Sequence, residues 1–198
     1  METIIRRKPI PDPEYPDRKI RKVAFTGYRP SKLPFGFNEE DVRCMDFKKR
    51  LHNTLESLIW QGYRHFLSGG ALGMDMYAAE AVMELQKQYP GICLEMVSPF
   101  DSQTEKWGTE YKKRHDYLFE NADIVTMTGH VYTKSALFTR NRYLVNSADL
   151  LLAAYDGQPG GTAMTISYAK KVGVQVCIIR PVIKNFEMWN GDGIEGNQ

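Results

Sequence analysis

The 198-residue sequence has few cysteines, few histidines and no long hydrophobic run. The three cysteines lie far apart without a CxxC pair, and the four histidines are scattered without metal-ligand spacing. The sequence therefore predicts neither a disulfide framework nor a metal site. No motif in it predicts a bound cofactor.

A membrane-length apolar segment and an excess of one charge are also missing. No apolar run approaches the ~20 residues that span a bilayer, and the N-terminal residues lack the apolar core of a secretory signal. The 26 basic and 24 acidic residues nearly balance at a net charge of +2, which neither demands nor excludes a nucleic-acid partner. We therefore expect a cytoplasmic protein without membrane contact.

Short apolar runs typical of buried parallel strands alternate with segments of helical periodicity. Strands are expected at residues 22–26, 65–67, 92–97, 122–127, 149–155 and 175–179. This alternation predicts an α/β fold, a single doubly wound, mostly parallel sheet of about six strands with helices on both faces. The proline- and charge-rich residues 1–20 are expected to form an extended lead, residues 21–183 the domain and residues 184–198 a polar tail.

Glycine-bearing turns follow three of the predicted strands, at residues 27–30, 68–75 and 157–162. The carboxyl ends of parallel strands meet at one edge of a sheet, where ligands bind. Glycine allows close backbone approach, and helix N-termini favour anions. The turns and nearby basic side chains therefore predict a phosphate or nucleotide site, with these candidate ligand-binding residues: Gly27, Arg29, Ser68, Gly69, Gly70, Gly73, Asp75, Arg140, Asn141, Arg142, Gly160, Gly161 and Thr162.

Each of these features has a simpler explanation when taken alone. A strand–glycine–helix turn is ordinary connection chemistry, and neither the GxGxxG fingerprint nor a P-loop is present. The arginines could be solvated, and Asp75 could cap a helix instead of contacting a ribose. The convergence of three such turns on one edge favours the nucleotide site.

Three segments together resemble the SLOG superfamily, namely GYRP after the first strand, LSGGALGMD after the second, and RNRYLVNSADLLLAAYDGQPGGT. This superfamily includes DNA-processing protein A and the Lonely Guy phosphoribohydrolases. The resemblance covers roughly residues 22–181 and is greatest to the small bacterial YpsA-like branch. It implies a Rossmann-like fold, a nucleotide-type ligand such as a phosphorylated nucleoside or an ADP-ribose-like molecule, and a homodimer.

The resemblance to the phosphoribohydrolases places their catalytic arginine at Arg140, nine residues before Asp149. Their PGGxGTxxE motif is shortened here, and Thr165 stands where they have a glutamate. Cleavage of an N-glycosidic bond needs a carboxylate, for which Asp75 and Asp156 are candidates. Hydrolysis of a nucleoside monophosphate therefore stays an alternative to nucleotide binding or sensing.

The RNR triplet at 140–142 also resembles the DNA-processing proteins, which bind single-stranded DNA. Such binding uses a basic groove and stacking aromatic residues. Aromatic residues near the predicted edge are Tyr28, Phe100, Phe138 and Tyr143. Because the chain is nearly neutral, single-stranded DNA is the less favoured partner.

Overall fold

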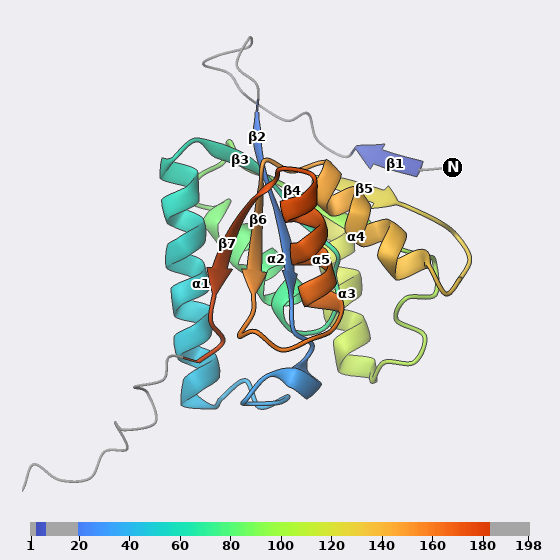
Figure 1. Cartoon of the computed structure of the whole chain (residues 1–198), viewed down its shortest axis with the longest axis horizontal. Helices are drawn as coiled ribbons and strands as arrows, with labels where there is room; N and C mark the ends of the chain where they lie inside the picture. The colour runs from blue at the N-terminus through green and yellow to red at the C-terminus, as the bar shows by residue number, and fades with distance from the viewer. Residues whose placement is uncertain (1–2, 7–19, 183–198) are drawn as a thin grey trace, which may run out of the picture.

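The computed structural model describes residues 3–6 and 20–182 of the chain. They form one seven-stranded sheet in the order β1-β5-β4-β3-β2-β6-β7, with helices on both faces (Figure 1). Strands β2 to β7 run parallel, and β1 joins one edge antiparallel to β5. The predicted doubly wound, mostly parallel α/β sheet is therefore confirmed.

The strands are β1 (Thr3–Arg6), β2 (Arg21–Gly27), β3 (Tyr63–Ser68), β4 (Cys93–Ser98), β5 (Ile124–Met127), β6 (Leu150–Ala154) and β7 (Gln175–Ile179). The helices are the short 3-10 turn η1 (Pro30–Lys32), α1 (Val42–Trp60), α2 (Met74–Leu85), α3 (Thr109–Asn121), α4 (Ala136–Asn146) and α5 (Gly161–Lys171).

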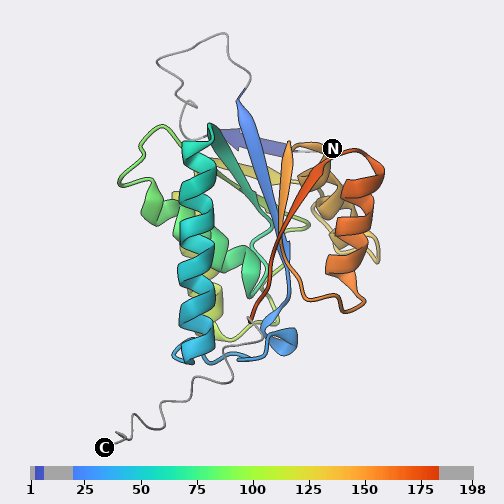
Figure 2. The same ribbon diagram turned by 60° about the vertical axis from the view of Figure 1, so that its left-hand side comes forward.

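Two helical layers enclose the sheet and give it two hydrophobic cores (Figure 2). Helices α1, α2 and α3 contribute to the core on one face, and α4 and α5 to the core on the other. Strands β4 and β6 are buried along their whole length, which explains why they read as continuous apolar runs and not as alternating patterns. The continuous apolar runs in the sequence thus correspond to strands that are buried on both faces of the sheet.

The N-terminal lead contains a strand that the sequence analysis did not predict. β1 pairs with β5 in a register that places Thr3 opposite Met127 and Arg6 opposite Ile124. A four-residue edge strand is held by backbone hydrogen bonds, which leave little trace in a side-chain pattern. The predicted polar tail, residues 184–198, lies outside the described residues. In the described part of the chain, no helix is long and apolar enough to cross a membrane.

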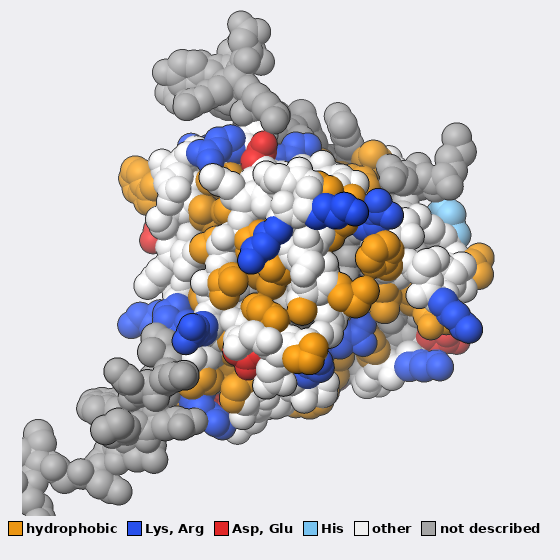
Figure 3. Space-filling model, viewed as in Figure 1, with side chains coloured by type: hydrophobic (Ala, Val, Ile, Leu, Met, Phe, Trp, Pro, Cys, Tyr) orange, Lys and Arg blue, Asp and Glu red, His pale blue; other side chains and the backbone are white. Residues whose placement is uncertain are grey.

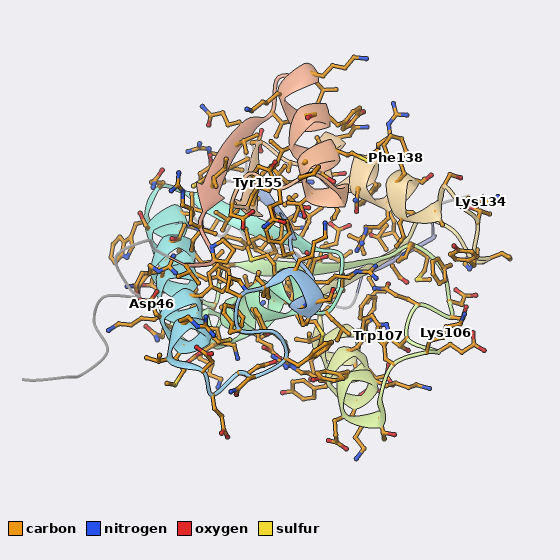
Figure 4. The ribbon with its side chains drawn as sticks, turned by 60° about the horizontal axis from the view of Figure 1, so that its bottom comes forward. Asp46, Lys106, Trp107, Lys134, Phe138 and Tyr155 are labelled. Carbon is orange, nitrogen blue, oxygen red and sulfur yellow. The ribbon has the colours of Figure 1, made fainter. Side chains whose placement is uncertain are left out.

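The strand order reverses at β2, which lies between β3 on one side and β6 on the other. Ligands of open α/β sheets bind outside the carboxyl ends of the strands at such a switch point. Figure 4 looks onto this edge, with η1 near the centre in front of the sheet and Phe138 of α4 farther to the right. A ligand site is therefore expected at the turns that follow β2, β3 and β6.

Candidate functional site

A cavity of about 380 Å³ lies at this switch point. Four parts of the chain line it: the end of β2 with the turn into η1, the turn between β3 and α2, one face of α4, and the start of α5. The lining residues are Phe25, Thr26, Gly27, Tyr28, Arg29, Ser31, Lys32, Ala71, Asp75, Leu137, Arg140, Asn141, Gly161 and Thr162.

Many of the residues predicted for the site line this cavity, namely Gly27, Arg29, Asp75, Arg140, Asn141, Gly161 and Thr162. A second group belongs to the two glycine turns but does not line it: Ser68, Gly69, Gly70, Gly73 and Gly160. Arg142 and Asp156 also lie outside the lining, as described below. The structure thus brings together the turns that the sequence analysis expected to converge.

Arg140 and Asp75 form a buried charged pair at the cavity. Their side chains are 5% and 9% exposed, and Arg140 Nη1 lies 3.6 Å from Asp75 Oδ2. Arg140 Nη1 also donates to the Gly69 carbonyl oxygen. Arg140 Nε is buried and has no hydrogen-bond partner among the described residues. A buried guanidinium with an unused donor is costly, so this cluster has hydrogen-bonding capacity left for a ligand.

Burial dominates the electrostatics of this pair. It raises the pKa of Asp75, an effect that the charges of Arg140 and Arg29 and the Ala71 N–H partly oppose. Burial likewise lowers the pKa of Arg140, against the opposing effect of Asp75. Because guanidinium groups stay protonated at physiological pH, the cavity keeps the positive charges of Arg140 and of the exposed Arg29. A polyanionic ligand would be stabilised there.

The first glycine turn, between β3 and α2, is packed from within. The buried Ser68 Oγ donates to the Asp75 carbonyl oxygen at 2.7 Å and accepts from the Gly70 N–H at 3.2 Å. A Cβ on Gly69 would coincide with the Arg140 guanidinium, and one on Gly73 would collide with the Tyr28 carbonyl oxygen. These residues support Arg140 and the neighbouring turn instead of offering a free surface.

The second glycine turn, between β6 and α5, is open. Apart from its chain neighbours and the backbone of its own helix, no atom of the described residues lies within 4 Å of a Cβ built on Gly161. Helix α5 begins after Gly160 without a side-chain cap from the described residues and without an acidic residue in its first turn. Its first N–H groups and the positive end of its dipole therefore remain available for an anion.

Lys32 is a cavity-lining residue that sequence reasoning missed, and Tyr28 was expected only as an aromatic residue near the edge. Lys32 reaches from η1 across the cavity mouth, where its Nζ donates to the Pro159 carbonyl oxygen at 3.1 Å. Tyr28 OH lies 2.5 Å from Asp156 Oδ1 and accepts from the Gln158 N–H at 3.2 Å. Burial, followed by the hydrogen bond to Asp156, raises the pKa of Tyr28 to about 12. Only their position after Arg29 or within the GYRP turn could have indicated them.

Arg142 and Asp156 are not part of the cavity. Arg142 is exposed on α4, where its guanidinium stacks on the rings of Phe138 at 5.5 Å and Tyr168 at 4.9 Å. Residues two apart on an α-helix point to nearly opposite sides, so Arg142 faces away when Arg140 faces the cavity. Asp156 is exposed and orients the second glycine turn through Tyr28 and Gln158.

Two polar contacts hold α4 in the orientation that places Arg140 at the cavity. Asn141 Nδ2 donates to Thr165 Oγ1 at 3.1 Å, and Tyr143 OH donates to Glu95 Oε1 at 2.8 Å. Burial raises the pKa of Glu95, but His65, with its Nε2 2.8 Å from Glu95 Oε2, and the hydroxyls of Thr126 and Tyr143 outweigh it and hold the pKa below its usual range. A buried carboxylate thus anchors α4 to the sheet.

Thr165 has a structural role in this arrangement. Its Oγ1 donates to the Gly161 carbonyl oxygen at 2.9 Å, besides accepting from Asn141. It therefore links α4 to the first turn of α5. Among residues 3–6 and 20–182, no three His, Cys, Asp or Glu side chains gather in a way that could hold a metal ion.

Solved structures with the same fold include DNA processing protein A from two bacteria. The Streptococcus pneumoniae structure aligns with a TM-score of 0.59 and 19% identity, covering 80% of this chain and 50% of that one. The Helicobacter pylori structure aligns with a TM-score of 0.56 and 19% identity, covering 80% and 64%. The chain thus spans about half to two thirds of these proteins, and the likeness concerns the fold.

Sequence relatives with higher identity are found in Bacillus. A UPF0398 protein of Bacillus cereus (strain B4264) is 32% identical over 158 residues, which cover 78% of this chain and 85% of that protein. A UPF0398 protein of Bacillus pumilus is 34% identical over 145 residues, covering 72% and 77%. The family model YpsA, described as the YspA SLOG family, matches residues 23–180. The chain therefore belongs to the YspA SLOG family.

Proposed function

We propose that this protein binds or senses a phosphorylated nucleoside or an ADP-ribose-like molecule in the cavity at the carboxyl edge of the sheet. The observation that carries the proposal is the buried Arg140, a lining residue of the cavity whose Nε has no hydrogen-bond partner among the described residues. The same cavity receives the uncapped start of α5. Buried donors without partners and a free helix N-terminus together suit the oxygens of a phosphate.

The other lining residues fit the remainder of such a ligand. Arg29 and Lys32 add positive charge at the exposed side of the cavity, and Asp75 is its one acidic residue. The half-buried Leu137 contributes apolar surface, while the amide of Asn141 adds polar hydrogen-bonding groups. Polar and charged residues make up more of the lining than apolar ones, which suits a ligand that carries phosphate and hydroxyl groups.

The geometry favours binding of the nucleotide without cleavage of its base–ribose bond. Hydrolysis of the base–ribose bond would need a carboxylate that can handle a proton. Asp75 is tied to the Ala71 N–H and lies beside Arg140, and Asp156 lies outside the cavity in contact with Tyr28. Phosphoribohydrolase activity is therefore the second candidate, and base release from nucleoside monophosphates tests it.

Single-stranded DNA binding is a third candidate. The Helicobacter pylori structure concerns the way that protein binds single-stranded DNA. In this chain, Phe100 packs edge-on against Tyr132, Phe138 against Arg142, and Tyr143 bonds Glu95. Figure 3 shows a face on which Lys and Arg side chains are spread among hydrophobic ones and do not form one basic groove. A steep salt dependence of oligonucleotide binding would favour this candidate.

Thermal unfolding against a ligand panel tests the proposal. The panel holds nucleoside monophosphates, ADP-ribose, cyclic ADP-ribose forms, NAD and a DNA oligomer. A ligand at about 100 times its Kd stabilises by roughly 2.7 kcal/mol, or about 5–10 °C for a chain of this size. Arg29→Ala is expected to weaken nucleotide binding roughly 10-fold or more. Arg142→Ala, which removes the same charge from the far side of α4, is expected to leave it unchanged.

Two results would contradict the proposal. One is the absence of a shift with every phosphorylated ligand, and the other is an equal loss in the Arg29 and Arg142 variants, which would indicate binding outside the cavity. The cytoplasmic location and the homodimer stay predictions, and light scattering measures the second.

A further inference from the structure

Lys32 lies where a cation is electrostatically unfavourable in the free protein. Its Nζ is 2.8 Å from the position that a Cβ on Gly160 would occupy, directly beside the start of α5. Cations at a helix N-terminus oppose the helix dipole, whereas anions are stabilised there. Among the described residues, no carboxylate lies within ion-pair distance of Lys32, and α5 has no acidic residue in its first turn.

The contact that holds Lys32 leaves most of its hydrogen-bonding capacity unused. An ammonium group has three donors, and the structure pairs one of them with the Pro159 carbonyl oxygen at 3.1 Å. The nearest aromatic surface is the Tyr28 ring, whose centroid lies 6.0 Å from Nζ. Lys32 is exposed and lines the same cavity as Gly161 and Thr162, so its ammonium group and the first N–H groups of α5 can reach one ligand.

From this geometry we infer that Lys32 is the residue by which the cavity selects phosphorylated ligands. One phosphate group would accept hydrogen bonds from Lys32 Nζ and from the first N–H groups of α5, and it would neutralise both positive charges. The inference rests on the proposed function and deepens it. It adds Lys32 of η1 to the cavity residues Arg140, Gly161 and Thr162 that the proposed function already relies on.

Matched pairs of ligands and variants test this role. Binding of each nucleoside and its 5′-monophosphate is measured by calorimetry for the unaltered protein, Lys32→Ala, Lys32→Arg and Lys171→Ala. Lys171 lies at the other end of α5, so that variant removes the same charge where no ligand is expected. Lys32→Ala should weaken the monophosphate roughly 10- to 100-fold and leave the nucleoside unchanged. Lys32→Arg should retain most of the affinity.

The outcomes separate this inference from the proposed function. If the unaltered protein binds phosphorylated ligands and Lys32→Ala binds them equally well, the role of Lys32 is wrong while the proposed function stands. An equal loss for nucleoside and monophosphate would also overturn it, because Lys32 would then only shape the cavity. If the unaltered protein binds none of the ligands, both proposals fail.

The free protein supplies an independent readout. Because Lys32 opposes the α5 dipole, Lys32→Ala should keep the melting temperature of the ligand-free protein within about 2 °C. A larger fall would make Lys32 a structural clamp between the two turns and overturn the inference. Inorganic phosphate alone should raise the melting temperature of the unaltered protein more than that of Lys32→Ala. Equal rises would count against a phosphate contact.

Discussion

The two glycine turns at the carboxyl edge look alike in the sequence and serve different purposes in the structure. In the turn between β3 and α2, Gly69 and Gly73 are glycine because other groups of the protein occupy the space of a side chain. In the turn between β6 and α5, Gly161 is exposed and its side-chain space is empty. Most of the first turn is packed against other parts of the protein, whereas Gly161 of the second turn lines the cavity with an open side-chain position.

Alanine substitutions in the two turns should give the largest contrast. Gly69→Ala would drive a Cβ into the Arg140 guanidinium and break the buried pair with Asp75. We expect it to lower the free energy of unfolding by about 3 kcal/mol or more. Gly161→Ala should change it by no more than about 0.5–1 kcal/mol, in the stabilising direction, because alanine favours the helix. Urea denaturation of both variants measures the difference.

Equal losses of stability in these two variants would remove the distinction between the turns. Both glycines lie outside the positive-φ region, so the comparison isolates the effect of space from that of backbone strain. Ligand affinity supplies the complementary measurement. It should fall in the folded fraction of Gly69→Ala because Arg140 is displaced.

Removing one hydroxyl from each turn should also destabilise the first turn more than the second, by a smaller difference in the free energy of unfolding. Ser68→Ala removes the buried acceptor of the Gly70 N–H and the donor to the Asp75 carbonyl oxygen, which should cost about 1–3 kcal/mol. Thr162→Val removes a hydroxyl for which the described residues show no partner, and should cost about 0.5 kcal/mol or less. Thermal unfolding measures both effects. Ligand binding should be weakened by Thr162→Val, and an unaffected Kd would place Thr162 outside the ligand contacts.

Lowering the pH should destabilise the packing around the first turn. We expect this loss of stability to be smaller than those of the glycine and hydroxyl substitutions in that turn. A Cβ on Gly70 would meet the Phe119 ring, on which the buried His115 ring stacks at 4.2 Å. Burial lowers the pKa of His115 below its usual 6.5, against the opposing effect of Asp116. The unfolded chain therefore takes up this proton first, and stability is lost as the pH falls below about 6.5 towards the folded-state pKa.

Replacing His115 isolates this contribution. In His115→Phe, the free energy of unfolding should fall less between pH 7 and pH 5 than in the unaltered protein. The buried Glu95 and the paired Glu39, whose pKa values are held below the usual range, lose their contribution only at lower pH, so they do not confuse this window. Identical slopes in the two proteins would show that His115 stays in the same protonation state.

The positions of the strands along the sequence were the most predictable part of this protein. The expected strand 175–179 coincides with β7 (Gln175–Ile179), and the expected run 149–155 encloses β6 (Leu150–Ala154). Strands that are buried on both faces have continuous apolar runs in the sequence. Helices with one buried face have apolar residues at spacings of three and four. β1 escaped prediction because an edge strand of four residues depends on backbone pairing with β5.

The site was predictable as a set of turns and less so as a set of side chains. Arg140 and Arg142 are the same residue type and lie two positions apart. Because residues two apart on an α-helix do not share a face, only one of them can point to the cavity. Lys32 carries no motif, and it enters the site because η1 places it opposite Pro159, 127 positions along the chain. Asp156 looked like a cavity carboxylate, yet Tyr28 holds it outside.

The sequence by itself determined the parallel sheet, its two helical layers and the glycine turns at the carboxyl edge, because these follow from local periodicity and backbone freedom. Only the tertiary structure decided which turn is filled and which is open. That outcome depends on contacts between distant segments: the Arg140 side chain fills the space beside Gly69, and Lys32 stands beside the start of α5. Such contacts are set by the packing of whole elements, which no short stretch of sequence encodes.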